Sequence, residues 1–143
     1  MCLTIKTKES ATYKIADRDI CVYKMVIRRQ DLPGYRTPYT EFNIPEDGKM
    51  RFPTDAGCEI ESRDRGTIDK PTHDSGIDGW GECWQVDIGF HSFLNRTVAD
   101  ETKHSMHDHK FLIIFEAVIP KGAKYLANDH GEAVSDMLDI CKI

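Results

Sequence analysis

The longest apolar run in the chain covers residues 111–119, and a Pro-Lys-Gly sequence follows it at once. The run is rich in isoleucine and phenylalanine, which favour strands, whereas proline and glycine end them. We therefore predict a buried central strand over 111–119 and a turn over 120–122. A second run, over 20–27, is apolar on both faces of an extended chain except at Lys24. It is predicted to be a strand buried on both sides, with Lys24 as the exception.

Shorter patterns predict the remaining elements. Residues 94–106 favour a helix with Asn95 as its N-cap. Residues 62–81 contain few apolar side chains and are predicted to be a long loop. Further short strands are expected at 2–5, 41–44, 49–52, 58–61, 85–88 and 123–126, with one or two closing strands over 134–143. These elements predict one α+β domain over 1–143, mainly antiparallel and β-rich, with one short helix.

Composition narrows the classes of protein. The chain has 143 residues, of which 40% are hydrophobic and 30% charged, as in ordered globular domains. Its 24 acidic residues outnumber 19 Lys and Arg, which gives a net charge of -5. An acidic chain is poorly suited to a phosphate backbone, so no nucleic-acid partner is expected. No apolar run approaches the ~20 residues that span a bilayer, and no secretion signal is evident, so we expect no membrane partner and a cytoplasmic location.

The five cysteines are odd in number and dispersed along the chain. In a chain without a secretion signal, such a pattern favours reduced thiols over a disulfide framework. Cys21 and Cys141 lie inside apolar runs. Both are predicted to be small core residues.

Three histidines, His104, His107 and His109, stand close together before the central strand. Imidazole is a common metal ligand, so this cluster is a candidate zinc site. However, no zinc signature spacing accompanies it. The alternative is an exposed helix end, where positively charged histidine is favourable.

A His-Ser pair, His91 and Ser92, lies between a predicted strand and the predicted helix. Adjacent residues on an extended chain point in opposite directions, so His91 cannot simply act as the base for Ser92. The structural interpretation is that Phe90 and Phe93 anchor the core while Ser92 helps to cap the helix.

Basic and aromatic side chains outside the core give further candidates. The pair Arg28 and Arg29 is expected to form surface ion pairs in this acidic chain. Aromatic residues in Gly- and Pro-rich loops can stack on a ligand or pack back onto the core. The loop aromatics are Tyr35, Tyr39, Trp80 and Trp84, and the candidate ligand-binding residues are Tyr23, Tyr39, Trp80 and His91.

Several fragments occur in an order that resembles a family of short proteins from phages and gut bacteria whose activity is not known. The fragments are Met1-Cys2-Leu3, Val22-Tyr23-Lys24, Thr37-Pro38-Tyr39, the Gly-Phe-His-Ser-Phe run at 89–93 and the run at 118–125. Their spread over most of the chain implies a single-domain architecture.

A second likeness is to ADP-ribosyltransferase toxins, which have an early strand bearing Arg or His, a Ser-Thr-Ser strand and a late Ile-Pro-Lys-Gly segment. Here Tyr23-Lys24, the run at 90–93 and the run at 119–122 are similar to these three elements. The likeness implies NAD as cosubstrate and Lys24, Ser92 and Asp136 as catalytic residues. Lys24 replaces Arg or His, Ser92 stands alone, and Asp136 is one methylene shorter than the expected Glu.

Three hypotheses result. The first is a non-enzymatic binding or accessory protein without a cofactor, acting on an unknown protein or small molecule. The second is an NAD-using transferase or its inactive relative, which requires Lys24, Ser92 and either Asp136 or Glu132 to line one cleft. The third is a metal-binding protein. A homodimer is one way to cover the edges of such a sheet.

Overall fold

The structure is a computed structural model that describes residues 3–5, 14–31, 33–38, 43–51, 72–73, 82–86, 89–107 and 109–141. It contains the α-helix α1 (Arg96–Ser105) and the 3-10 helix η2 (His109–Phe111). The strands are β1 (Leu3–Ile5), β2 (Lys14–Ile15), β3 (Ile20–Ile27), β4 (Lys49–Arg51), β5 (Thr72–His73), β6 (Glu82–Val86), β7 (Phe90–Phe93), β8 (Leu112–Ile119), β9 (Lys124–Ala127), β10 (Glu132–Ser135) and β11 (Met137–Ile140).

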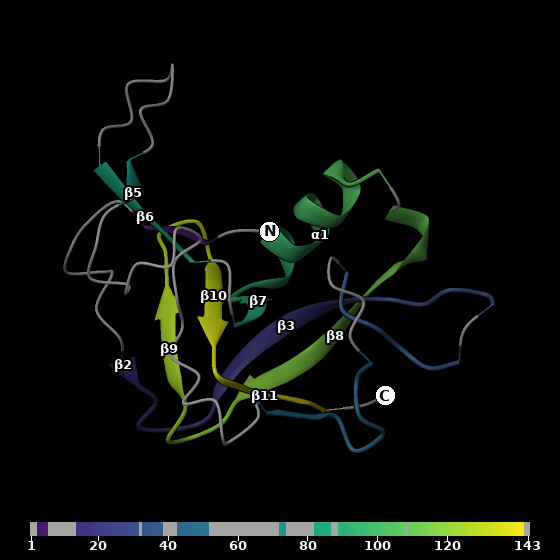
Figure 1. Cartoon of the computed structure of the whole chain (residues 1–143), viewed down its shortest axis with the longest axis horizontal. Coiled ribbons are helices and arrows are strands. Elements are labelled where there is room, and N and C mark those ends of the chain that lie inside the picture. The colour runs from purple at the N-terminus through teal and green to yellow at the C-terminus, as the bar shows by residue number, and fades with distance from the viewer. Residues whose placement is uncertain are drawn as a thin grey trace.

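Eight of these strands form one sheet in the order β2-β9-β10-β7-β3-β8-β11-β4, and β1-β6-β5 form a smaller sheet (Figure 1). All of the strand pairs are antiparallel. The prediction of a mainly antiparallel, β-rich fold with one α-helix is confirmed for the described residues. The described helix is not long and apolar enough to cross a membrane.

The longest pairing in the main sheet joins β3 and β8. It runs over eight residue pairs, from Ile20 opposite Ile119 to Ile27 opposite Leu112. Because β8 lies between β3 and β11, the predicted central strand is confirmed. Phe111, the first residue of the apolar run, belongs instead to η2, since hydrophobicity alone does not fix where a strand begins.

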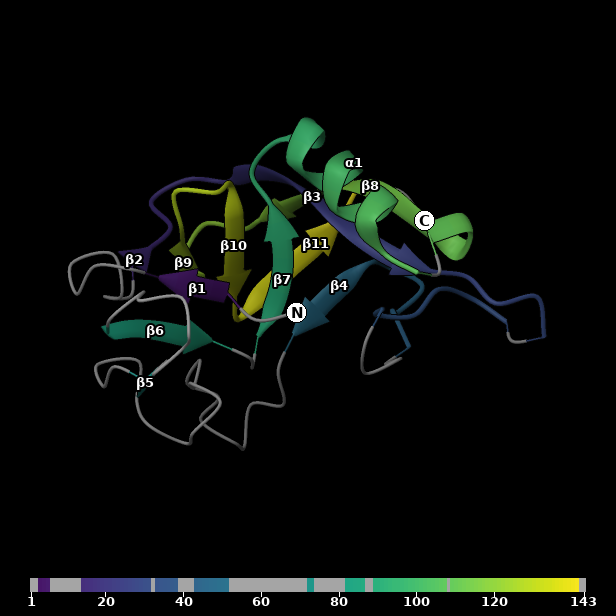
Figure 2. The ribbon, with the colours of Figure 1, turned by 90° about the horizontal axis from the view of Figure 1, so that it is seen from above.

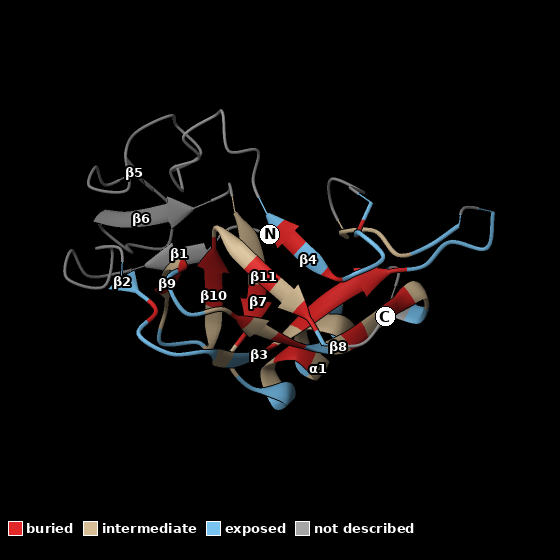
Figure 3. Cartoon of the chain, turned by 90° about the horizontal axis from the view of Figure 1, so that it is seen from below, coloured by how far each residue is buried: buried red, intermediate tan, exposed pale blue. Residues whose placement is uncertain are grey.

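The two faces of this sheet bury different clusters. On one face α1 packs over β7, β3 and β8 (Figure 2), where Met25, Ile27 and Phe93 are buried. The other face carries the larger core, which Figure 3 shows in red. This core contains both Ala133 of β10 and Met50 of β4, although these strands stand far apart in the strand order. Their membership of one cluster means that this core extends over most of the sheet.

The helix begins as its sequence predicts. The Oδ1 atom of Asn95 accepts a hydrogen bond of 2.8 Å from the backbone N–H of Val98, which confirms Asn95 as the N-cap. The backbone N–H of Leu94 donates to the carbonyl of Gly131, 2.7 Å away, and so joins the helix start to the turn before β10. Ala99 is the only helix residue that is fully buried, so the contact with the sheet is narrow.

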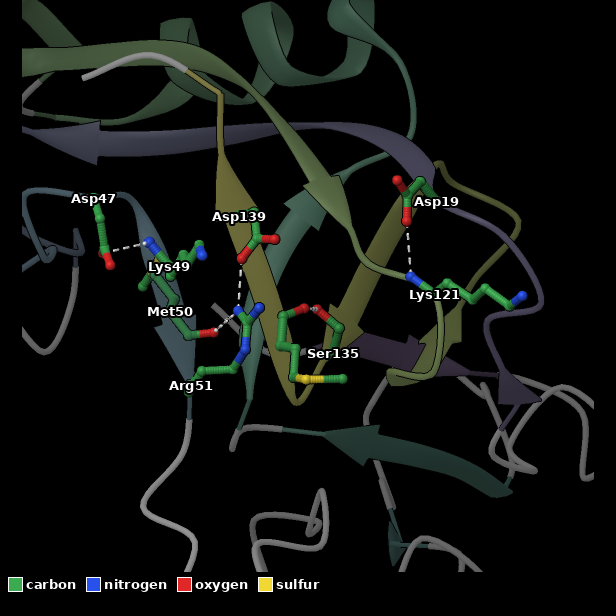
Figure 4. Close-up of polar contacts among 9 residues, drawn as sticks. Asp19, Asp47, Lys49, Met50, Arg51, Lys121, Ser135 and Asp139 are labelled. Atoms are coloured by element: carbon green, nitrogen blue, oxygen red, sulfur yellow. Dashed lines mark hydrogen bonds and ion pairs between the residues drawn. The ribbon is translucent and has the colours of Figure 1, made fainter.

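Polar contacts join neighbouring segments at the ends and the edge of the main sheet (Figure 4). The Nη1 atom of Arg51 on β4 donates to Oδ1 of Asp139 on β11, 2.6 Å away, and to the carbonyl of Met50, 2.9 Å away. The backbone N–H of Lys121 donates to Oδ1 of Asp19 over 2.9 Å, which joins the turn after β8 to the start of β3. The exposed charges on β4 disfavour the addition of a further strand at this edge.

Three predictions about burial are wrong. Lys24 is only 5% exposed, whereas Cys21 and Cys141 are exposed. Lys24 shares a face with Val22 and Val26, which belong to the larger core, so it is buried with them. Cys21 shares its face with Tyr23 and Met25 but lies beyond the part of β3 that α1 covers. An apolar pattern cannot indicate where a covering helix stops.

Other expectations concern element boundaries. Two residues of the predicted loop, Thr72–His73, form β5, and Trp84 lies in β6 rather than in a loop. Only residues 43 and 44 of the predicted strand 41–44 are among the described residues, and Asn43 forms an isolated bridge with Arg36. The predicted strand 58–61 lies outside the described residues.

Candidate functional site

A surface depression of about 800 Å³ lies where β3 ends and β8 begins. Two separate stretches of the chain line it, the loop after β3 and the stretch formed by η2 and the start of β8. Its lining residues are Arg28, Arg29, Gln30, Asp31, Pro33, Lys110, Phe111 and Ile113. A volume of this size falls in the range that small molecules and short peptide segments occupy.

Backbone hydrogen bonds shape the depression. Ile27 and Arg36 exchange two N–H···O bonds of 2.8 and 2.9 Å, which close residues 28–35 into a loop at the end of β3. The backbone N–H of Arg28 then donates to the carbonyl of Phe111, 3.1 Å away. A main-chain hydrogen bond therefore joins the two stretches, which we call the two walls of the depression. This bond does not depend on the side chains that line the depression.

The side chain of Arg28 is held against an aromatic support. Its Cζ lies 5.4 Å from the centre of the Tyr35 ring, and its Nη1 lies 3.4 Å from the Tyr35 hydroxyl oxygen. Tyr35 in turn meets Phe115 of β8 edge to face, with 5.0 Å between ring centres. Tyr35 thus packs onto the core, the second of the two roles that its place in a loop suggested.

The charge of the depression is opposite to that of the whole chain. Among the described residues that line it, Arg28, Arg29 and Lys110 contribute three positive charges, and Asp31 contributes one negative charge. Lys110 lies with its Nζ 5.5 Å from the centre of the Phe111 ring. In a chain of net charge -5, this concentration of cations forms a local positive potential over an apolar floor.

A second candidate lies inside the core, on the face of the sheet opposite α1. Tyr23 of β3 stands opposite Phe93 of β7, so the next residues along these two strands, Lys24 and Ser92, are neighbours on that face. The Nζ atom of Lys24 donates to the backbone carbonyl of His91, 2.8 Å away. Burial lowers the pKa of Lys24 from 10.5 to about 8, because desolvation disfavours its charged form.

One interpretation of the sequence gave Ser92 a role in capping the helix, but Ser92 does not have this role in the structure. It is fully buried within β7, and its Oγ has no hydrogen-bond partner among the residues that the structure describes. Asn95 takes the capping position three residues later. Ser92 is therefore an unsatisfied hydroxyl beside a buried amine, although no bond joins the two.

The remaining transferase candidates lie elsewhere. Ala133 of β10 pairs with Ser92. Asp136 follows β10 and lies three residues, or about 10 Å, further along the chain than Ala133. Its Oδ1 accepts a hydrogen bond of 2.9 Å from the backbone N–H of Lys124. Glu132 stands opposite Phe93, which places it on the α1 face, and it accepts a bond from Asn128. The structure brings Lys24 and Ser92 together but not with either acid.

The histidine cluster spans the end of α1. Nδ1 of His104 lies 2.7 Å from the carbonyl oxygen of Asp100, and His107 is exposed. The side chain of His109 is outside the described part, so the three-histidine metal site stays a prediction. Within the described ranges, no group of three or more His, Cys, Asp or Glu side chains could hold a metal ion.

The four candidate ligand-binding residues divide into two pairs. Tyr39 and Trp80 lie outside the described residues. Tyr23 and His91 are half-buried on the main sheet, and Nδ1 of His91 lies 3.2 Å from the carbonyl oxygen of Gly89. Neither of the described two lines the depression.

The surface ion pairs expected for Arg28 and Arg29 stay a prediction, and the sequence pattern did not connect these residues with Lys110 and Phe111. One pattern in the sequence could have indicated the site. Lys110 precedes the central strand β8, and Arg28 and Arg29 follow β3, which pairs with β8. No protein-family model matches the chain, and the chain is similar to no curated protein and to no solved structure.

Proposed function

We propose that this chain is a small binding or accessory protein, of the phage type that its motifs resemble, and that the depression between Arg28 and Lys110 binds an anionic ligand. The observation that carries the proposal is the gathering of three cations around an apolar floor in an acidic chain. Arginine held over an aromatic ring is already ordered, so little side-chain entropy is lost when an anion binds.

Calorimetric titration with inorganic phosphate, citrate and a synthetic acidic peptide tests this function. We expect at least one of these anions to bind, with an affinity that falls as salt is raised. Arg28→Glu should weaken binding about tenfold or more. Lys121→Glu is a matched control, because this exposed side chain lies outside the depression and the substitution changes the net charge equally. Equal loss in both variants would show that only net charge matters.

A second candidate function is NAD-dependent transfer. The strand order β7-β3-β8 supports it, because these neighbouring strands carry the run at 90–93, Lys24 and the start of the run at 119–122, with Lys24 next to Ser92. The burial of both residues and the use of the Asp136 carboxylate by Lys124 argue for an inactive relative. Release of nicotinamide from NAD by the purified protein, lost in Lys24→Met, would support activity, and no release would leave the binding function alone.

A further inference from the structure

The size and lining of the depression limit the kinds of ligand that can fill it. A volume of about 800 Å³ greatly exceeds that of a single inorganic anion. Pro33, Phe111 and Ile113 add apolar surface that a small ion would leave in contact with water. A ligand that gains from the whole depression must therefore carry a large apolar group as well as negative charge.

The arrangement of the cations suits a ligand whose negative charges are spaced apart, rather than a ligand with one compact, highly charged group. Arg28 and Arg29 belong to the loop after β3, whereas Lys110 belongs to η2 on the opposite wall. A ligand with acidic groups at intervals can reach both walls at once. The planar guanidinium of Arg28, laid over Tyr35, suits the flat fork of a carboxylate, with which arginine forms paired hydrogen bonds.

The cations alone would also suit phosphate, but other features of the described residues near the depression count against it. The backbone N–H of Arg28 already donates to Phe111. The end of α1 that leads into η2 is its C-terminal end, where the helix dipole is negative. Asp31 adds a negative charge to the rim. It would repel a polyphosphate, but it could accept a hydrogen bond from a peptide N–H.

We infer that the depression binds an acidic peptide segment of a partner protein, in which Asp or Glu residues flank a large apolar side chain. The inference rests on the proposed function and adds the chemistry of the occupant. The apolar side chain lies on Phe111 and Ile113, and the flanking carboxylates meet Arg28 on one wall and Lys110 on the other.

Fluorescence anisotropy with labelled synthetic peptides tests this inference. The probe is a short peptide with a central Phe flanked on each side by Glu and Asp. One control peptide replaces Phe with Ser, and a second replaces the acids with Gln and Asn. Inorganic phosphate and ATP serve as competitors, at about 50 mM and about 200 mM salt.

The probe should bind about tenfold more tightly than either control peptide, since both the apolar group and the charges contribute. Arg28→Glu and Lys110→Glu, placed on opposite walls, should each weaken the probe about tenfold, and Arg28→Lys several-fold through loss of the planar fork. Lys121→Glu should change the affinity less than about twofold. Circular dichroism melting of each variant confirms that it folds, and the two walls provide independent tests.

Three results would overturn the inference. If the Ser-containing peptide binds as well as the probe, the apolar floor takes no part and only charge is recognised. If phosphate or ATP binds while the probe does not, anion binding stands and the peptide is wrong. If no anion of any kind binds, the proposed function fails together with the inference.

Discussion

Replacing Lys24 with Met removes an amine from the core while keeping a flexible side chain of similar length. Desolvation lowers the pKa of Lys24 from 10.5 to about 8, and at about 1.4 kcal/mol per pKa unit this difference corresponds to about 3 kcal/mol. The lysine hydrogen bond to the His91 carbonyl offsets about 1 kcal/mol. Near pH 7 we therefore expect Lys24→Met to be more stable than the natural chain by about 2 kcal/mol.

The pH dependence gives the sharper test. Below pH 8 the lysine is charged in both the folded and the unfolded state, so the full penalty is present. Between pH 8 and 10.5 the unfolded chain binds more protons than the folded chain, so the stability of the natural chain rises with pH. Above pH 10.5 the amine is neutral in both states, and the advantage of Lys24→Met should vanish.

Urea unfolding at steps from pH 7 to 10, followed by circular dichroism under reducing conditions, measures this difference. Lys14→Met is the control, because Lys14 is exposed on the edge strand β2. It should show little change in stability at any of these pH values. The reasoning is refuted if Lys24→Met is less stable than the natural chain at pH 7 by an amount that does not vary with pH.

Four further substitutions, the last of them a control, test the fold by the same unfolding assay. Asn95→Ala should lower stability by about 1 kcal/mol through loss of the helix cap, and an unchanged midpoint would contradict that role. Ser92→Ala should stay within about 0.5 kcal/mol of the natural chain, because its hydroxyl has no partner to lose; a large loss would reveal one. Gly89→Ala should cost more than about 2 kcal/mol, since φ is +139° and a Cβ would collide with Val134. Gly122→Ala, at φ +91° with open space around it, should cost only about 1 kcal/mol, and equal costs would exclude the collision.

Local sequence was sufficient for the elements that depend on neighbouring residues. The apolar run before Pro120 predicted β8 to within one residue, and the run 20–27 coincides with β3. Asn95 was recognised as an N-cap because its capping bond reaches only three residues along the chain. Periodicity and turn residues act over such short distances, so they can be read directly.

The burial of single residues was harder to predict from the sequence. Lys24 and Cys21 both belong to β3, yet the polar one is buried and the apolar one is exposed. The outcome depends on how far α1 extends over one face and on where the larger core lies on the other. Both are set by pairings between distant segments, which the local pattern does not contain.

The sequence by itself determined the two long strands β3 and β8, the helix start and the antiparallel, β-rich character of this protein, because these follow from the order of apolar and turn-forming residues. Only the tertiary structure decided that Arg28 and Lys110, 82 positions apart, line one depression. It also decided that Lys24 and Ser92 are neighbours. In each case the antiparallel pairing of strands, a long-range choice of partner and register, sets the distance between the side chains.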